Sequence, residues 1–305
     1  MNMKNLLIMA LVGTTVMVSN NYAQATDSSS WTTSGQSSVL FSQLAMENWA
    51  AGGEDAITLT GMANLTANYV KGSANWDNAL HLAYGFSRQG NDPTQKSDDR
   101  LEFTSKYGHA RSEHWFYSAA LNFKTQFSAG YKLPDDSTIV SQFMAPGYLT
   151  LSLGMDYKRD DTFSAMISPV SGKVTFVQNQ DLADAGAFGV TPAEYDTSGS
   201  LISAGETMRA EFGASANLVW RKKVMENINL STSLGLFSNY LEKPQNVDIN
   251  WELELNLKVN DYVSATLNTQ FVYDDDTRFP NDAGIMIAKP QFKEIIGVSL
   301  TYQFF

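Results

Sequence analysis

Residues 247–259 read VDINWELELNLKV, a stretch in which apolar and polar residues alternate at every step. Side chains of a β-strand point alternately to opposite faces, so this stretch predicts a strand with one apolar face and one polar face. It is longer than the ~9–11 residues that cross a bilayer as a tilted strand. The stretch therefore predicts a membrane-spanning strand with lipid on one side and water on the other.

The same period of two recurs along the chain, for example in residues 57–69, 115–127, 149–157 and 228–240, and gives about twelve strands. A soluble β-sandwich also alternates, so the connections must distinguish the two folds. Longer connections at about 131–146, 178–205 and 275–290 alternate with short polar turns. The short turns lie at 71–73, 111–113, 158–161, 221–223 and 260–261.

An even strand count with short turns on one rim and long loops on the other is typical of a bacterial outer-membrane barrel. We therefore predict an all-β fold: a transmembrane antiparallel β-barrel of about twelve strands, with short periplasmic turns and longer extracellular loops.

The first residues have the pattern of an export signal. Lys4 precedes an apolar run at 6–12, and Ala23-Gln24-Ala25 has the small residues of a cleavage site. We predict a Sec-type signal peptide at 1–25 that is removed, a short periplasmic segment at 26–35 and the barrel at 36–305. The predicted location is the outer membrane of a Gram-negative cell.

The last residues, 296–305, alternate and end in aromatic side chains. They resemble the C-terminal assembly signal of outer-membrane barrels, which Tyr302, Phe304 and Phe305 would provide. The alternating phase ends at Phe304, so Phe305 is an extra residue with an open role. The resemblance implies that the barrel-assembly machinery is a partner of this strand.

Three segments resemble those of a Bacteroidota family catalogued as domain of unknown function 3078. They are NWAAGG at 48–53, SPVSGKV at 168–174 and AGAFGV at 185–190. The resemblance covers about residues 31–305. It implies an outer-membrane barrel and implies no reaction.

The charge is unevenly distributed. The chain has no cysteine and a formal charge of −11, which excludes a disulfide scaffold, a thiolate metal site and a basic nucleic-acid binder. The acidic surplus lies in the longer connections, for example at Asp98, Asp99 and 135–136. It predicts either a solvated external rim, or a Ca²⁺ or Mg²⁺ site that could also bridge to lipopolysaccharide phosphates. The best metal candidates are Asp274, Asp275 and Asp276, which lack the spacing and glycine of an EF-hand loop.

Several charged residues fall on the face opposite the apolar stripe, and a barrel places that face inside. They are Glu102, Lys106, Lys124, Arg209, Glu211, Glu252, Glu254 and Lys293. Glu102 and Lys124 stand at similar distances from the turn at 111–113, so we expect them to be neighbours. The mixed signs predict either a structural network of ion pairs or a selectivity region near Arg209, Glu211, Glu252 and Glu254.

No residue pattern indicates an enzyme or a cofactor site. The three histidines, His81, His109 and His114, are not placed as a lipid-facing serine hydrolase or an external protease would require.

Two functions remain open. The first is a narrow passive channel for small hydrophilic solutes, and the second is a non-transporting structural or assembly partner with an occluded lumen. In either case outer-membrane lipid and lipopolysaccharide are expected partners. The oligomeric state is not predicted.

Overall fold

The computed structural model describes residues 30–46, 54–132, 137–281 and 283–304. The predicted signal peptide, the segment at 48–53, the acidic pair at 135–136 and Phe305 lie outside these residues.

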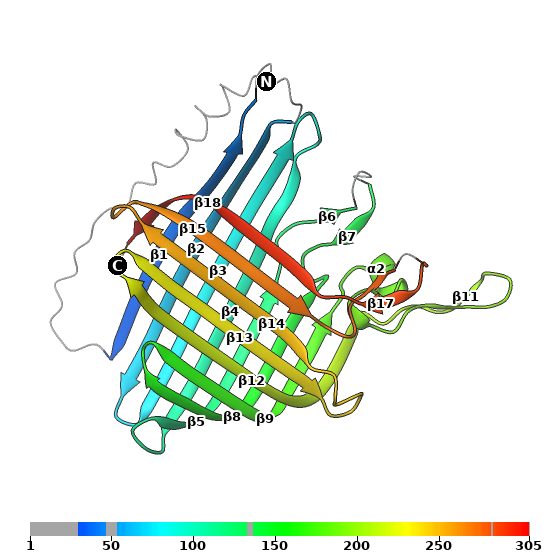
Figure 1. Cartoon of the computed structure of the whole chain (residues 1–305). Helices are drawn as coiled ribbons and strands as arrows, with labels where there is room; N and C mark the ends of the chain where they lie inside the picture. The colour runs from blue at the N-terminus through cyan, green and yellow to red at the C-terminus, as the bar shows by residue number, and fades with distance from the viewer. Residues whose placement is uncertain (1–29, 47–53, 133–136, 282, 305) are drawn as a thin grey trace. The chain divides into compact units, whose positions relative to one another are not determined.

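Twelve antiparallel strands form one closed barrel, as the alternating sequence predicts (Figure 1). They are β1 (Trp31–Leu44), β2 (Ala56–Lys71), β3 (Ala74–Gln89), β4 (Gln95–Ala110), β5 (Trp115–Thr125), β8 (Gly147–Asp160), β9 (Phe163–Phe176), β12 (Met208–Met225), β13 (Ile228–Asn239), β14 (Asp248–Lys258), β15 (Val263–Tyr273) and β18 (Gln291–Gln303). Each strand pairs with the next barrel strand along the chain, and β18 returns to β1.

The pairing of β1 with β18 closes the barrel. It runs from Gln36 opposite Gln303 to Phe41 opposite Val298. A closed sheet leaves no edge strand with unpaired backbone groups, which is the condition for placing β-structure in hydrocarbon.

The two faces of the barrel differ as the alternation predicts. Large apolar side chains on the outer face are accessible, for example Leu153 at 58%, Ile167 at 62% and Ile296 at 65%. Small hydroxyl side chains are buried on the inner face of β8, β9 and β12, where Ser171 Oγ lies 3.0 Å from Ser152 Oγ and 2.8 Å from Ser215 Oγ. This inverts the arrangement of a soluble protein.

Aromatic side chains gather at the rim with the short turns. The Trp31 ring lies 5.2 Å from Tyr69, and the Trp115 ring lies 5.1 Å from Tyr157. Amphipathic rings favour the boundary between hydrocarbon and water, so this rim has the character of an interface.

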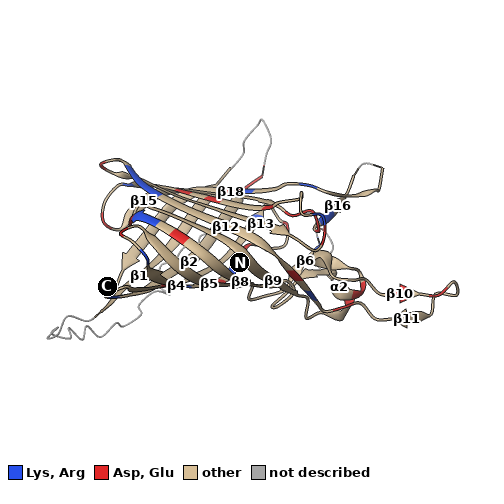
Figure 2. Ribbon diagram, turned by 90° about the horizontal axis from the view of Figure 1, so that it is seen from below, with Lys and Arg blue, Asp and Glu red and all other residues tan. Residues whose placement is uncertain are grey.

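The other rim has the long connections, which contain small elements of their own. These are β6 (Gly130–Tyr131), β7 (Ile139–Ser141), α2 (Gln180–Asp184), η1 (Ala187–Gly189), β10 (Glu194–Tyr195), β11 (Leu201–Ser203), β16 (Arg278–Pro280) and β17 (Met286–Ala288). Val177, Ala183 and Val190 form a compact apolar core there. Figure 2 shows red Asp and Glu segments along the loops of β10, β11 and α2. No helix in the described ranges is long and apolar enough to cross a bilayer.

Several boundaries differ from the sequence prediction, as follows. The expected turn at 221–223 is wrong, because β12 runs to Met225 and the turn lies at 226–227. Consecutive cations indicated a turn, but the strand and its pairing with β13 continue through them. Asp98 and Asp99 lie within β4 rather than in a loop. The first strand begins at Trp31, before the expected barrel start at residue 36.

A charged substitution on the outer face of the barrel should destabilise the protein in a membrane. Leu153 lies in the middle of β8 and points outward, so Leu153→Arg should lower the unfolding free energy in lipid vesicles by about 2–4 kcal/mol, the cost of a charge at the bilayer midplane. Urea titration followed by tryptophan fluorescence measures it. Leu201→Arg in β11, outside the barrel, is the control and should change little. Equal stability of the two variants would contradict the orientation of β8.

Candidate functional site

The interior of the barrel contains an ion-pair network that crosses it from wall to wall. Arg100 on β4 donates from Nη1 to Glu252 Oε2 on β14 at 3.0 Å, and its Nη2 donates to Glu252 Oε1. Five strands separate β4 from β14 in either direction round the barrel. The two side chains therefore come from opposite walls and meet across the lumen.

Two further charges complete this contact. Lys124 Nζ on β5 lies 3.8 Å from Glu252 Oε1, and Glu102 Oε2 lies 3.6 Å from Arg100 Nε. Glu102 and Lys124 stand directly opposite each other in the β4–β5 register. We call Arg100, Glu102, Lys124 and Glu252 the cross-bridge. Its two cations and two anions balance, which lowers the cost of placing charge inside the barrel.

Neutral amides bind the same carboxylates. Asn122 Nδ2 donates to Glu102 Oε1 at 2.8 Å, and Gln270 Nε2 donates to Glu252 Oε1 at 3.3 Å. The carboxylates thus keep several donors each, as charged groups away from bulk water require.

The side chains of the cross-bridge are only partly buried. The side chains of Arg100, Lys124 and Glu252 keep 23%, 27% and 27% of their accessible surface. Glu254, on the same inward phase of β14 and closer to the short-turn end of the strand, is exposed. The barrel interior therefore has space for a water-sized molecule beside the cross-bridge and beside Glu254.

A second group of charges lies where the barrel meets its long loops. Lys173 Nζ on β9 lies 2.7 Å from Asp248 Oδ2 on β14 and 3.7 Å from Asp274 Oδ2 in the β15–β18 connection. It also lies 3.7 Å from Glu211 Oε2 on β12. Lys173 therefore joins two barrel strands and one loop to β9.

Arg209 makes the companion contacts on β12. Its Nη2 lies 2.6 Å from Asp276 Oδ2 and 3.2 Å from Glu211 Oε1, and its Nη1 donates to the carbonyl of Gly189 at 3.3 Å. We call Lys173, Arg209, Glu211, Asp248, Asp274 and Asp276 the mouth cluster. It fastens the connection after β15 to the barrel wall and encloses a cavity of about 20 Å³ between Arg209, Glu211 and Asp276.

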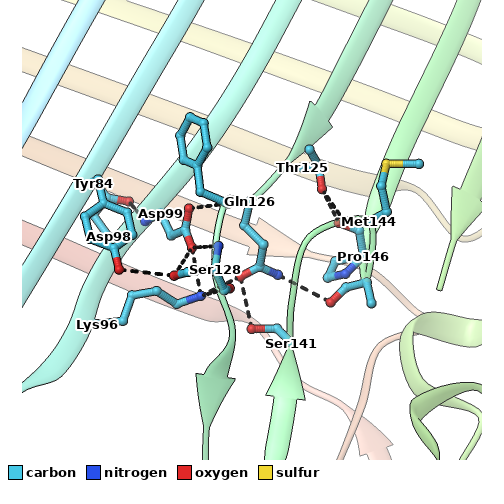
Figure 3. A network of polar contacts seen from close by, with 12 residues as sticks. Tyr84, Lys96, Asp98, Asp99, Thr125, Gln126, Ser128, Ser141, Met144 and Pro146 are labelled. Atoms are coloured by element: carbon cyan, nitrogen blue, oxygen red, sulfur yellow. Dashed lines mark hydrogen bonds and ion pairs between the residues drawn. The ribbon is translucent and has the colours of Figure 1, made fainter. Parts of the chain in front are cut away.

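A third polar network anchors the connection between β5 and β8 (Figure 3). Asp99 accepts from the backbone N–H groups of Phe127 and Ser128 at 2.6 and 3.0 Å. Lys96 Nζ donates to Asp99, to Gln126 Oε1 and to the Ser128 carbonyl at 2.8–2.9 Å. These bonds hold the start of the connection against β4.

The remaining predicted interior charges make separate contacts. Lys106 Nζ lies 2.6 Å from Asp156 Oδ2 on β8, and Lys293 Nζ lies 2.8 Å from Asp98 Oδ1 on β4. Glu254 makes no ion pair within the described ranges. The structure thus divides the eight predicted charges among the cross-bridge, the mouth cluster and these isolated positions.

Sequence reasoning missed Arg100, Asp156, Lys173 and Asp248. Arg100 shares the phase of Glu102 and Lys106, and Asp248 shares that of Glu252, so the alternation could have found both. Lys173 was hidden because a bulge at Ser168-Pro169 shifts the register between β8 and β9 and changes the inward phase of β9.

The three candidate metal ligands bind different cationic or amide partners. Asp274 faces Lys173, and Asp276 faces Arg209. Asp275 accepts from Asn246 Nδ2 at 2.8 Å and lies 3.5 Å from Lys243 Nζ. No group of carboxylate or imidazole side chains in the described ranges has the arrangement of a metal site.

The histidines lie apart from one another. His81 Nδ1 lies 2.8 Å from Asn64 Oδ1 inside the barrel. His109 lies near Ser73, and His114 contacts Tyr157 edge-on.

Comparison with known proteins adds a partial family match. A family described as "Protein of unknown function (DUF3078)" matches residues 41–131, less than a third of the chain. No curated protein matches the sequence.

Solved structures of β-barrels align over most of the chain with low similarity. An outer membrane channel from Pseudomonas putida F1 is 12% identical, with a TM-score of 0.41, and the alignment covers 94% of this chain and 100% of that one. The NanC porin is 8% identical, with a TM-score of 0.36, and the alignment covers 88% and 98%. The channel DcaP of Acinetobacter baumannii is 9% identical, with a TM-score of 0.33, and the alignment covers 90% and 97%.

The cross-bridge generates a test by double-mutant cycle. We expect Arg100→Ala and Glu252→Ala each to lower the unfolding free energy, and their effects to be coupled by about 0.5–3 kcal/mol because each removes the other's partner. Urea titration of the wild type, both single variants and the double variant in lipid vesicles measures the coupling. Additive effects would show that the two side chains do not interact across the lumen.

Proposed function

We propose that this protein is an outer-membrane β-barrel that forms a narrow, passive channel for small hydrophilic solutes. The observation that carries the proposal is the combination of charged and water-accessible side chains on the inner face. Arg100, Lys124 and Glu252 keep about a quarter of their surface accessible, and Glu254 is exposed on the lumen side. A barrel filled by packed side chains would bury these groups.

The outer face supports the membrane location. Exposed apolar side chains cover it, and the aromatic rings at the short-turn rim suit a lipid interface. By the usual topology of such barrels, the short turns lie in the periplasm and the long connections lie outside the cell. The predicted signal peptide at 1–25 provides the export route that this location requires.

The cross-bridge sets the size of what passes. Eight strands enclose a lumen just filled by side chains, and sixteen leave a wide aqueous channel, so twelve strands lie between these cases. The Arg100–Glu252 contact divides the lumen at its level. Solutes must pass beside it, which favours small ions and small polar molecules.

Selectivity follows from the charges that are not neutralised. The cross-bridge is balanced, and neither Glu254 nor the inward-phase Arg221 has an ion pair in the described ranges. The cavity of the mouth cluster is lined by more carboxylates than cations. We infer that the mouth of the channel favours cations, because an unbalanced negative lining raises their local concentration.

The cross-bridge also supports a second candidate function. A contact between opposite walls, together with the loop held down by the mouth cluster, is the arrangement expected of an occluded barrel. Such a protein would act as a structural or assembly partner through its loops. Lipopolysaccharide around the outer rim and the assembly machinery at β18 are the partners proposed for either function.

Single-channel recording separates the two functions. We expect small discrete current steps from the wild type in planar bilayers, and larger steps from the Arg100→Ala/Glu252→Ala variant because the division of the lumen is removed. The matched control is Lys106→Ala/Asp156→Ala, which removes an ion pair between β4 and β8, only one strand apart.

A silent wild type and a silent cross-bridge variant would overturn the channel and support the occluded barrel. Equal current increases in the cross-bridge variant and the control would show that the cross-bridge is not the constriction.

A further inference from the structure

The outer wall has a recessed groove at the short-turn end. Phe163, Leu218, Trp220, Thr232, Leu234 and Trp251 line it, on β9, β12, β13 and β14. Its volume is about 400 Å³, within the ~300–1,000 Å³ range of small-molecule sites. The register places all these side chains outward, since Trp220 stands opposite both Phe163 and Thr232, and Leu234 stands opposite Leu218 and Trp251.

Two of the polar side chains that line the groove bond to each other and to the backbone. Trp251 Nε1–H donates to Thr232 Oγ1 at 2.8 Å, and the Thr232 hydroxyl donates to the backbone carbonyl of Glu252 at 2.9 Å. The groove therefore presents mainly hydrocarbon and aromatic surface, which suits an alkyl chain rather than a polar molecule.

One cation of the outer face stands beside the groove on the rim side. Lys222 lies two residues beyond Trp220 in β12, whereas Arg221 and Lys223 have the opposite, inward phase. Lys222 shares the outward phase of Trp220, lies roughly 7 Å further along the strand, and has its Nζ 5.8 Å from the Trp220 ring.

Lys222 lacks the neutralising partner that the cations of the cross-bridge and the mouth cluster have. It makes no ion pair in the part of the chain that the structure describes, whereas Arg159 at the neighbouring turn pairs with Asp160 at 2.9 Å. An apolar groove that ends at an unpaired, outward lysine is complementary to an amphiphile with a negative head group.

We propose that this rim groove binds one anionic phospholipid, with an acyl chain in the groove and the phosphate at Lys222. The proposal rests on the proposed membrane location. The short-turn rim lies at the periplasmic leaflet under the topology of such barrels, so the ligand is a phospholipid rather than lipopolysaccharide, which faces the long loops.

Native mass spectrometry of detergent-solubilised protein tests the proposal, with phosphatidylglycerol, phosphatidylethanolamine and lipid A added separately. We expect the wild type to retain one phosphatidylglycerol preferentially. Lys222→Gln should reduce its retention to that of phosphatidylethanolamine, and Thr232→Trp, which fills the groove, should reduce retention of both. Lys71→Gln at the end of β2, on the same rim, is the matched control and should bind as the wild type does.

Three results would overturn the proposal. They are equal retention of all head groups, equal effects of Lys222→Gln and Lys71→Gln, and a lipid-free dimer, which would assign the groove to a second copy of the chain. Retained heat-modifiable gel mobility shows that each variant is folded. Recovery of the protein without membrane insertion would instead refute the membrane location itself, so the two failures are distinguishable.

Discussion

The pairing of β1 with β18 is the constraint on which the rest of the structure depends. Six residue pairs, from Gln36–Gln303 to Phe41–Val298, convert a strip of strands into a closed surface. Without them, two edge strands would present unpaired backbone groups, which hydrocarbon does not tolerate. Closure also brings β4 and β14 to opposite walls, so the cross-bridge exists only because the ends of the sheet meet.

Charge inside the barrel follows from closure and alternation together. Because side chains alternate along a strand, every second one points into the barrel. Closure of the sheet places residues that are far apart in the sequence at the same height along the barrel axis. Arg100 and Glu252 are 152 positions apart in the chain. Their contact joins two opposite walls, and in the proposed channel it narrows the interior at the same point. One pair of side chains would therefore couple the stability of the barrel to permeation.

The alternating pattern was sufficient to predict the fold and the inward face, because both depend on local geometry. The strand count and the opposition of Glu102 to Lys124 across one short turn are of this kind. The cross-bridge was not predictable. Alternation shows which side chains point inward, but not which of them lie at the same height along the barrel axis and are long enough to contact each other. The bulge at Ser168-Pro169 and the extension of β12 through Arg221–Lys223 were also not predictable. Both depend on pairing with a neighbouring strand, which the local sequence pattern does not contain.

The central claim is that the cross-bridge is the narrowest point of a continuous water path. The chain has no cysteine, so Glu254→Cys introduces a unique thiol on the short-turn side of the cross-bridge. Its labelling by a membrane-impermeant thiol reagent, added from the long-loop side of oriented vesicles, measures passage directly. The account predicts much faster labelling when Arg100 and Glu252 are both replaced by Ala, with labelling from the short-turn side unchanged. Equal rates from the long-loop side with and without the cross-bridge would contradict it.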